Sequence, residues 1–136
     1  MKFLDANILL RYFTRDDGAK ADACYALLQR VQSGQEEITT CEAVIAEIVY
    51  VLSSRNIYNM GRQDIQGRLL PILSLPGLKL PQKRTYLRAL NLYVAHPRLD
   101  FEDALAVAHM ERQHIATLLS YDRDFDRIST ITRQEP

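Results

Sequence analysis

The sequence has few of the features that mark secreted, membrane-spanning or repetitive proteins. Its two cysteines, Cys24 and Cys41, show neither CxxC nor Cys/His ligand spacing, and both stand among apolar residues. This favours buried free thiols over disulfides or a zinc site. No apolar run approaches the ~20 residues that a membrane helix needs, and the first residues make a poor signal peptide. We therefore expect a cytoplasmic protein that does not associate with membranes.

The charges balance overall but are unevenly distributed along the chain. The 136 residues include 17 basic and 17 acidic side chains, and 47% of them are hydrophobic, which is typical of one globular domain spanning residues 1–136. Residues 55–99 carry one acid, Asp64, and eight bases: Arg55, Arg62, Arg68, Lys79, Lys83, Arg84, Arg88 and Arg98. Such a block can dock a polyanion, although an ordinary solvated face explains it at least as well.

Short apolar segments alternate with helical patterns, with no internal repeat or low-complexity tract. The patterns predict helices over residues 6–13, 19–32, 41–55, 62–73, 84–95 and 101–113. Strands are expected over residues 1–4, 37–40, 115–121 and 129–132, with a short extended piece at 78–80. Helices and strands in this order predict an α/β fold with a mainly parallel sheet covered on both faces.

Two aspartates follow predicted strands directly. Asp5 closes the stretch KFLD, and Asp122 closes LLSYD. Binding sites in parallel α/β sheets form at the carboxyl ends of strands, so both positions suit a site. Each also has an ordinary explanation, because Asp5 can cap a helix and Asp122 can sit in a turn.

Two further carboxylates fall on helices. Glu47 interrupts the apolar stretch VIAEIVYVL, in a helix predicted to be buried, where an ionised carboxylate is costly unless paired or bound to metal. Asp103 stands in the first turn of the helix that begins at DFEDALAVAH. There Asp100 is the natural N-cap, and Asp103 could merely favour the helix N-terminus.

Taken together, these four acids predict a metal site. Clustered carboxylates repel one another unless a cation lies among them, and hard divalent ions prefer oxygen ligands. Asp124 is a candidate outer ligand. Asn7 could fix a carboxylate by hydrogen bonding, and Ser120 could offer its hydroxyl to the cluster. Helix capping and an ordinary strand-end serine explain these last two positions about as well.

Four segments, in this order, resemble the PIN domain and, more narrowly, the VapC-like ribonuclease toxins of toxin–antitoxin pairs. They are MKFLDANILLRYF, AEIVYVL, DFEDALAVAH and LLSYDRDF. The family's acidic quartet maps onto Asp5, Glu47, Asp103 and Asp122, and Asp124 matches an additional acid. Many members have Thr where this chain has Ser120, which keeps the hydroxyl.

The resemblance implies a three-layer α/β/α fold with a central parallel sheet of about five strands. It also implies Mg²⁺ or Mn²⁺ as cofactor, RNA as substrate, a homodimer, and a small inhibitory antitoxin as partner. The apolar helices over residues 41–73 could offer that antitoxin a groove, or could simply pack in the core.

Two alternatives stay open at the level of sequence. A non-catalytic PIN-like module would bind RNA or protein without cutting. A phosphohydrolase or receiver domain would use Asp5 as nucleophile, but such sites usually need a lysine near the phosphate, and no lysine follows a clear late strand.

Overall fold

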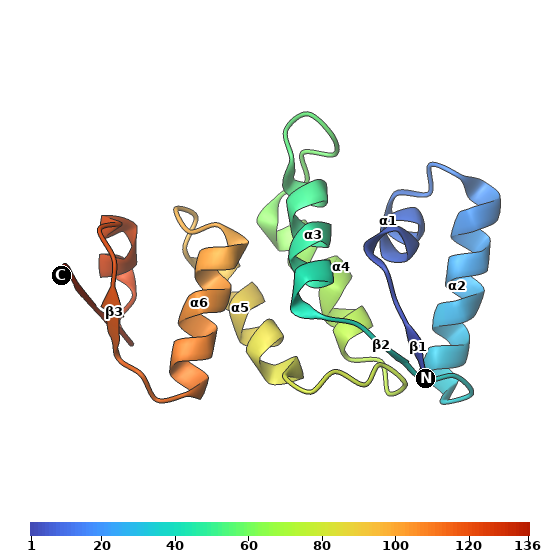
Figure 1. The fold of residues 1–136 in the computed structure, drawn as a ribbon. Helices are drawn as coiled ribbons and strands as arrows, with labels where there is room; N and C mark the ends of the chain where they lie inside the picture. The colour runs from blue at the N-terminus through green and yellow to red at the C-terminus, as the bar shows by residue number, and fades with distance from the viewer. The chain divides into compact units, whose positions relative to one another are not determined.

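The structure, a computed structural model, describes residues 1–136 and divides into two compact units, Met1–Pro81 and Gln82–Pro136. The first unit contains β1 (Lys2–Phe3), α1 (Ala6–Thr14), α2 (Gly18–Ser33), β2 (Ile38–Thr39), α3 (Glu42–Ser53) and α4 (Arg62–Leu73). The second contains α5 (Lys83–Ala95), α6 (Phe101–Arg112), β3 (Thr117–Leu119), a 3₁₀ helix η1 (Arg123–Arg127) and β4 (Thr132–Gln134). Figure 1 shows these elements in chain order.

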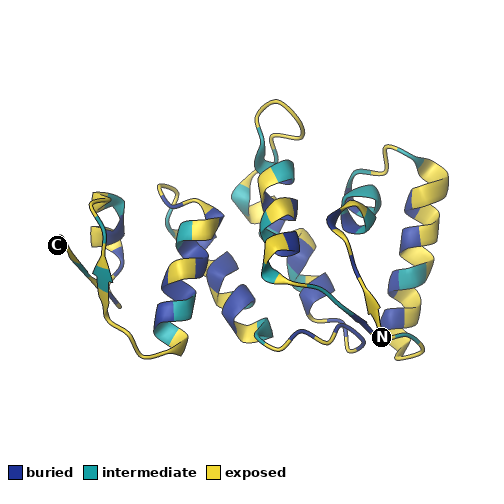
Figure 2. Cartoon of the chain, viewed as in Figure 1, coloured by how far each residue is buried: buried dark blue, intermediate teal, exposed yellow.

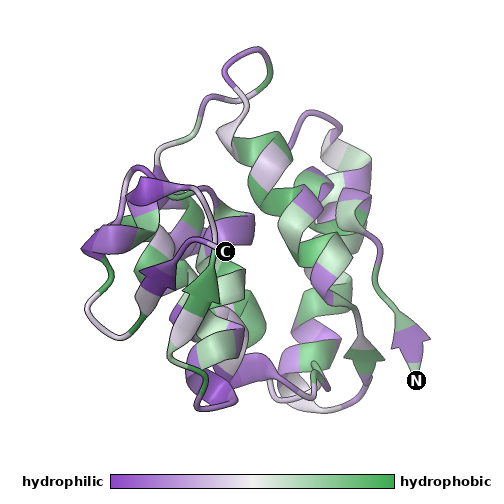
Figure 3. Ribbon diagram, turned by 60° about the vertical axis from the view of Figure 1, so that its left-hand side comes forward, coloured by the Kyte–Doolittle hydropathy of each residue, from purple (hydrophilic) through white to green (hydrophobic).

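The six predicted helices are all present, each within three residues of its predicted ends. Capping residues in the sequence determine where several of these helices begin and end. Asp17 caps α2 by accepting a hydrogen bond from the Lys20 backbone N–H at 3.1 Å, and Gly34 ends that helix in the left-handed region at φ 81°. Figure 3 shows hydrophobic and hydrophilic residues mixed along the helices, and in α1 the buried residues Ala6, Leu9 and Phe13 recur every three or four positions and so share one face.

Strands of the first unit pair in parallel. Lys2 lies opposite Ile38 and Phe3 opposite Thr39, and Leu78 forms a single parallel bridge on the other side of Ile38. Ile38 is therefore the middle residue of three extended segments, and its side chain is buried. Around it, α1 packs against α2 and α3, and α3 packs against α4.

The second unit is built on the packing of α5 against α6, whose sides carry most of its buried residues (Figure 2). Tyr93 and Phe101 meet edge to face, with ring centroids 5.7 Å apart. Arg88 of α5 donates two hydrogen bonds, at 2.7 and 3.0 Å, to Glu111 of α6, which also accepts from Thr130 at 2.9 Å. The Arg88 guanidinium holds the pKa of the Glu111 carboxyl below its usual range.

β3 and β4 also run parallel, with Leu118 opposite Arg133. All strand pairing is thus parallel, as predicted, but the structure has four strands in two pairs rather than about five in one sheet. The last strand was predicted at residues 129–132 and lies at Thr132–Gln134 instead. The extended piece at 78–80 makes only one bridge, and Pro81 follows it without an N–H to continue the pairing.

No helix of the structure is both long enough and apolar enough to cross a membrane. The prediction that both thiols are buried is half wrong. Cys24 is buried on α2, and burial raises the pKa of its thiol, whereas Cys41 is exposed at the N-cap of α3. Neither forms a disulfide.

Gly77 lies where two segments of the first unit approach most closely. A Cβ at this position would come within 2.6 Å of the Val31 carbonyl oxygen and nearer still to that of Glu36. The Gly77 N–H also donates to the Val31 carbonyl at 3.1 Å, so backbone atoms on both sides are fixed.

We predict that Gly77→Ala lowers the free energy of unfolding by roughly 1–3 kcal/mol, because backbone atoms cannot move aside as a flexible side chain can. Gly67→Ala is the matched control. It lies inside α4 with open space around the new methyl group, so it should stabilise the protein by about 0.5–1 kcal/mol. Urea unfolding of both variants measures the difference, and equal effects would contradict the close approach at Gly77.

Candidate functional site

Asp5 is held at the carboxyl end of β1. The Leu4 N–H donates to the Thr39 carbonyl at 2.8 Å, and the Thr40 hydroxyl donates to the Leu4 carbonyl at 2.8 Å, so the residue before Asp5 is clamped to the end of β2. Asp5 is the N-cap of α1 but its side chain makes no capping hydrogen bond. Its exposed carboxylate therefore keeps both oxygens available, and the capping explanation does not account for it.

Glu47 is exposed, which corrects the prediction that it lies in an apolar setting. The helix α3 buries one face, made by Val44, Ile45, Ile48, Val49 and Leu52. Glu47 lies on the opposite side, with exposed Ala43 and Tyr50 one turn away in each direction. The apolar composition of the helix does not reveal this exposed side. Because Glu47 is exposed, its ionised carboxylate carries no desolvation penalty and is accessible to a ligand.

Asn7 is exposed in the first turn of α1, and its amide makes no hydrogen bond to a carboxylate. The predicted role of this amide in fixing Asp5 is not seen in the first unit.

Asp103 belongs to a reciprocal capping pair at the start of α6. The Asp100 carboxylate accepts from the Asp103 N–H at 2.8 Å, and the Asp103 carboxylate accepts from the Asp100 N–H at 3.4 Å. Burial raises the pKa of the Asp103 carboxyl, and the negative charges of Asp100 and, less strongly, Asp122 raise it further. Asp100 thus caps the helix, as predicted, while Asp103 completes the capping box and carries a charge that its surroundings disfavour.

Residues 120–126 form an acidic turn after β3. The Ser120 hydroxyl accepts a hydrogen bond from the Asp122 N–H at 3.0 Å, and the Asp122 carboxylate accepts one from the Asp124 N–H at 2.9 Å. The Asp124 carboxylate lies 3.6 Å from the guanidinium of Arg98. Ser120 therefore orders the turn as a backbone acceptor, while one oxygen of Asp122 stays available.

The predicted ligands divide between the two units. Asp5 and Glu47 belong to the first unit, and Asp103, Asp122 and Asp124 belong to the second. Within either unit, no three histidine, cysteine, aspartate or glutamate side chains gather closely enough to hold a metal ion. In the second unit, the structure brings Asp103 into electrostatic reach of Asp122, and Asp122 into hydrogen-bond contact with Asp124.

Sequence reasoning missed two arginines near the acidic turn. Arg98 was counted only as one of the basic block, yet it pairs with Asp124. Arg133 was not singled out, although its guanidinium donates to the turn itself, to the Ser120 carbonyl at 2.9 Å and to Asp126 at 2.8 Å. Nothing in the local sequence marks either contact, because each joins segments that come together only when the chain folds.

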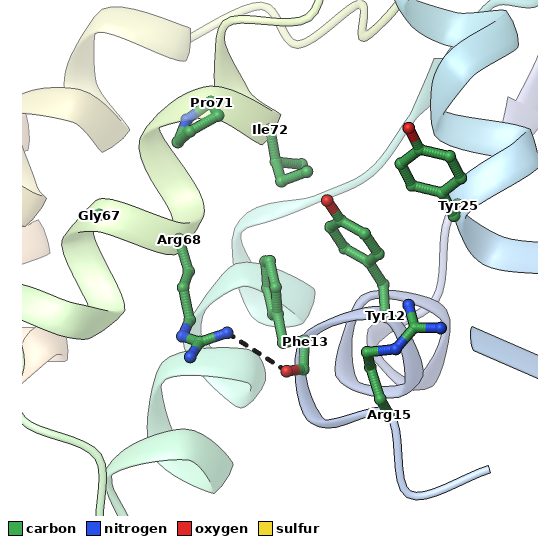
Figure 4. Close-up of a pocket in the computed structure, with 8 residues that line it drawn as sticks. All are labelled: Tyr12, Phe13, Arg15, Tyr25, Gly67, Arg68, Pro71 and Ile72. Atoms are coloured by element: carbon green, nitrogen blue, oxygen red, sulfur yellow. Dashed lines mark hydrogen bonds between the residues drawn. The ribbon is translucent and has the colours of Figure 1, made fainter. Parts of the chain in front are cut away.

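A pocket of about 430 Å³ opens between α1, α2 and α4 of the first unit (Figure 4). Its lining residues are Tyr12, Phe13, Arg15, Tyr25, Gly67, Arg68, Pro71 and Ile72. The rings of Tyr12 and Tyr25 stack with centroids 6.3 Å apart, and Arg68 donates to the Phe13 carbonyl at 3.2 Å. The pocket contains none of the predicted carboxylates, and it shares only α4 with the groove predicted along residues 41–73.

Comparisons with known proteins show which family the chain resembles. A family model of the PIN domain matches residues 2–131. The VapC ribonuclease Mb1869c of Mycobacterium bovis is 31% identical over 134 residues, covering 98% of both chains. Ribonuclease VapC13 of Mycobacterium tuberculosis shows the same identity and coverage.

The two acids of the capping pair should differ in their effect on stability. We predict that Asp103→Asn does not lower the free energy of unfolding at neutral pH and raises it by up to about 1 kcal/mol, because it removes a disfavoured charge and keeps an acceptor. Asp100→Ala, which removes the acceptor of the Asp103 N–H, should cost about 0.5–2 kcal/mol. Denaturant unfolding compares them, and equal losses would mean that the Asp103 charge serves the fold.

Proposed function

The chain belongs to the PIN-domain family and, within it, to the VapC ribonucleases, and we propose on this basis that it is a metal-dependent ribonuclease that hydrolyses RNA phosphodiester bonds. The fold class is that of this family, three-layer α/β/α. The family match spans both compact units, which supports a single functional domain over residues 1–136. The match is to the PIN domain rather than to a phosphohydrolase or receiver domain.

The observation that carries this proposal is the placement of the acids at strand ends. Asp5 lies just beyond β1, with only Leu4 between them, and the acidic turn that carries Asp122 and Asp124 follows β3. Asp103 lies in the first turn of α6, whereas Glu47 lies in the middle of α3. Asp5 and the acidic turn thus occupy the positions where parallel α/β proteins build their sites, and Glu47 and Asp103 add carboxylates from helices.

These side chains suit Mg²⁺ or Mn²⁺. All the proposed ligands are carboxylates, the hard oxygen donors that such ions prefer. Asp5 has both oxygens available, and the raised pKa of Asp103 reflects burial and negative neighbours whose cost a cation would offset. When bound, the cation supplies Lewis-acid chemistry, activating water as the nucleophile and offsetting charge that develops on the phosphate.

In the proposed mechanism Asp5, Asp103 and Asp122 would hold the cation, and Glu47 or Asp124 would complete the ligand set or orient the attacking water. Ser120 keeps Asp122 in place through the N–H contact described above. No side chain acts as a nucleophile, so no covalent intermediate forms on the protein. The reaction breaks a P–O bond of the RNA backbone and adds water across it.

Arginine side chains near the acids would bind the RNA backbone. Arg98 is exposed and lies 3.6 Å from Asp124, so its guanidinium can reach a phosphate at the site. Other members of the basic block serve the fold as well, since Arg88 pairs with Glu111 and Arg68 bonds the Phe13 carbonyl. We assign Arg98 to the substrate because, among the basic block, it pairs with one of the proposed ligands.

We predict that the purified protein cleaves members of a panel of structured RNAs in the presence of Mn²⁺ or Mg²⁺, and that EDTA stops the reaction. Asp5→Asn should lower the rate roughly 10²-fold or more, because it removes a charge that holds the cation. Asp64→Asn, the same change at an exposed site on α4, should leave the rate unaltered. Gel analysis of end-labelled RNA measures all four conditions.

Cleavage that survives both EDTA and Asp5→Asn would contradict the mechanism. A folded, metal-loaded protein that binds RNA but cuts none of it would favour the alternative, a non-catalytic RNA- or protein-binding module.

We propose further that a small antitoxin inhibits this ribonuclease in the cytoplasm, that two copies of the chain form a homodimer, and that the antitoxin occupies the pocket between α1, α2 and α4. The pocket combines aromatic and aliphatic side chains with the guanidinium of Arg68, while the guanidinium of Arg15 pairs with Asp22 at 2.8 Å. This lining suits a short segment that carries mainly apolar side chains. The buried face of α3, by contrast, is occupied by core packing.

We predict that the small protein encoded beside this chain co-purifies with it, and that Tyr25→Glu weakens the complex tenfold or more, since one anchor residue commonly contributes about 2 kcal/mol. Tyr50→Glu is the matched control, because Tyr50 is exposed on α3 and does not line the pocket. Titration calorimetry compares the affinities. An equal loss in both variants would reject the pocket as the docking site.

A further inference from the structure

Arg133 of β4 is largely enclosed, with 12% of its side chain exposed. Its guanidinium donates to the Ser120 carbonyl at 2.9 Å, to the two oxygens of Asp126 at 2.8 and 3.4 Å, and to Glu135 at 3.0 Å. A planar guanidinium can satisfy several acceptors at fixed angles, which the point charge of a lysine cannot reproduce. The contacts of Arg133 therefore depend on its shape as well as its charge.

These contacts reach the acidic turn near both of its ends. Ser120 begins the turn and Asp126 lies beyond its two candidate ligands, Asp122 and Asp124. Between these two contacts, two consecutive hydrogen bonds order the turn. The Ser120 hydroxyl accepts from the Asp122 N–H, and the Asp122 carboxylate accepts from the Asp124 N–H. The Ser120 N–H also donates to the Gln134 carbonyl at 3.1 Å, so β4 fixes the start of the turn twice.

We propose that Arg133 is a positioning residue that holds Asp122 and Asp124 in the geometry needed to bind a divalent cation. This inference rests on the proposed function, because it assigns these two acids to the cation. Arg133 itself donates to Ser120, Asp126 and Glu135, and to neither of the two ligands. Partners of this indirect kind typically change metal affinity 10- to 100-fold when they are lost.

Because Arg133 is positively charged, its two possible roles predict changes in cation affinity of opposite sign. A positive charge near a cation site opposes binding, so removing it should tighten cation binding if only electrostatics mattered. Loss of positioning has the opposite effect and should weaken binding. The sign of the change therefore separates the two roles.

The experiment measures Mn²⁺ binding by electron paramagnetic resonance of the free ion, for the wild type, Arg133→Gln and Arg133→Lys. Arg127→Gln is the control, because it removes the same charge from an exposed residue of η1. We expect both Arg133 variants to bind Mn²⁺ about 10- to 100-fold more weakly, and Arg127→Gln to bind it as tightly as the wild type or more so. Backbone amide exchange at Asp124, measured without metal, should accelerate in both Arg133 variants.

Unchanged or tighter Mn²⁺ binding in both Arg133 variants would overturn the positioning role and leave the proposed function intact. A wild type that is folded and binds no Mn²⁺ would instead overturn the proposed function, and this inference with it. Circular dichroism checks that each variant folds. If Arg133→Gln does not fold, Arg133→Lys decides the question alone, since it keeps the charge and loses the planar contacts.

Discussion

Parallel pairing of short strands is the constraint on which the rest of this structure depends. Two strands that run in the same direction end at the same edge, so whatever follows each of them is brought to that edge. In the first unit, Asp5 and the start of α3 follow the paired strands β1 and β2. In the second unit, the acidic turn follows β3, which pairs with β4. Only a few backbone hydrogen bonds hold each pair, and side-chain contacts such as Thr40 to Leu4 and Arg133 to Ser120 strengthen the strand ends.

The capping geometry and the charge of Asp103 have opposite effects on stability. Its carboxylate completes a capping pair, which favours the helix, yet burial and two negative neighbours disfavour its charge. A neutral side chain would serve the fold at least as well. The cation that we propose at this site would offset the disfavoured charge, whereas the capping contact does not require a charged side chain.

Sequence patterns predict the parts of this protein that local interactions determine. The helix at Arg62–Leu73 begins and ends where the flanking Gly61 and the Pro76-Gly77 turn indicate, and Asp5 and Asp122 follow strands as expected. The prediction that Glu47 lies in an apolar setting is wrong, because apolar composition does not show which side of a helix faces solvent. The prediction that Cys41 is buried is wrong for the same reason, since neighbours in the sequence do not show which side chains face solvent. The roles of Arg98 and Arg133 could not be predicted, because each depends on segments that meet only in the folded chain. Whether the carboxylates of the two units act together stays a prediction.

The elements that pack or pair within the two units differ in their separation along the chain, which affects the order in which they fold. Helices α5 and α6 are neighbours in sequence and can pair by closing a short loop. By contrast, β1 must find β2 after α1 and α2 have been made, since Lys2 pairs with Ile38. Pairings between distant residues cost more loop-closure entropy and form more slowly. We therefore expect Asp5 to reach its place late, and substitutions that weaken the β1–β2 pair to speed unfolding more than they slow folding.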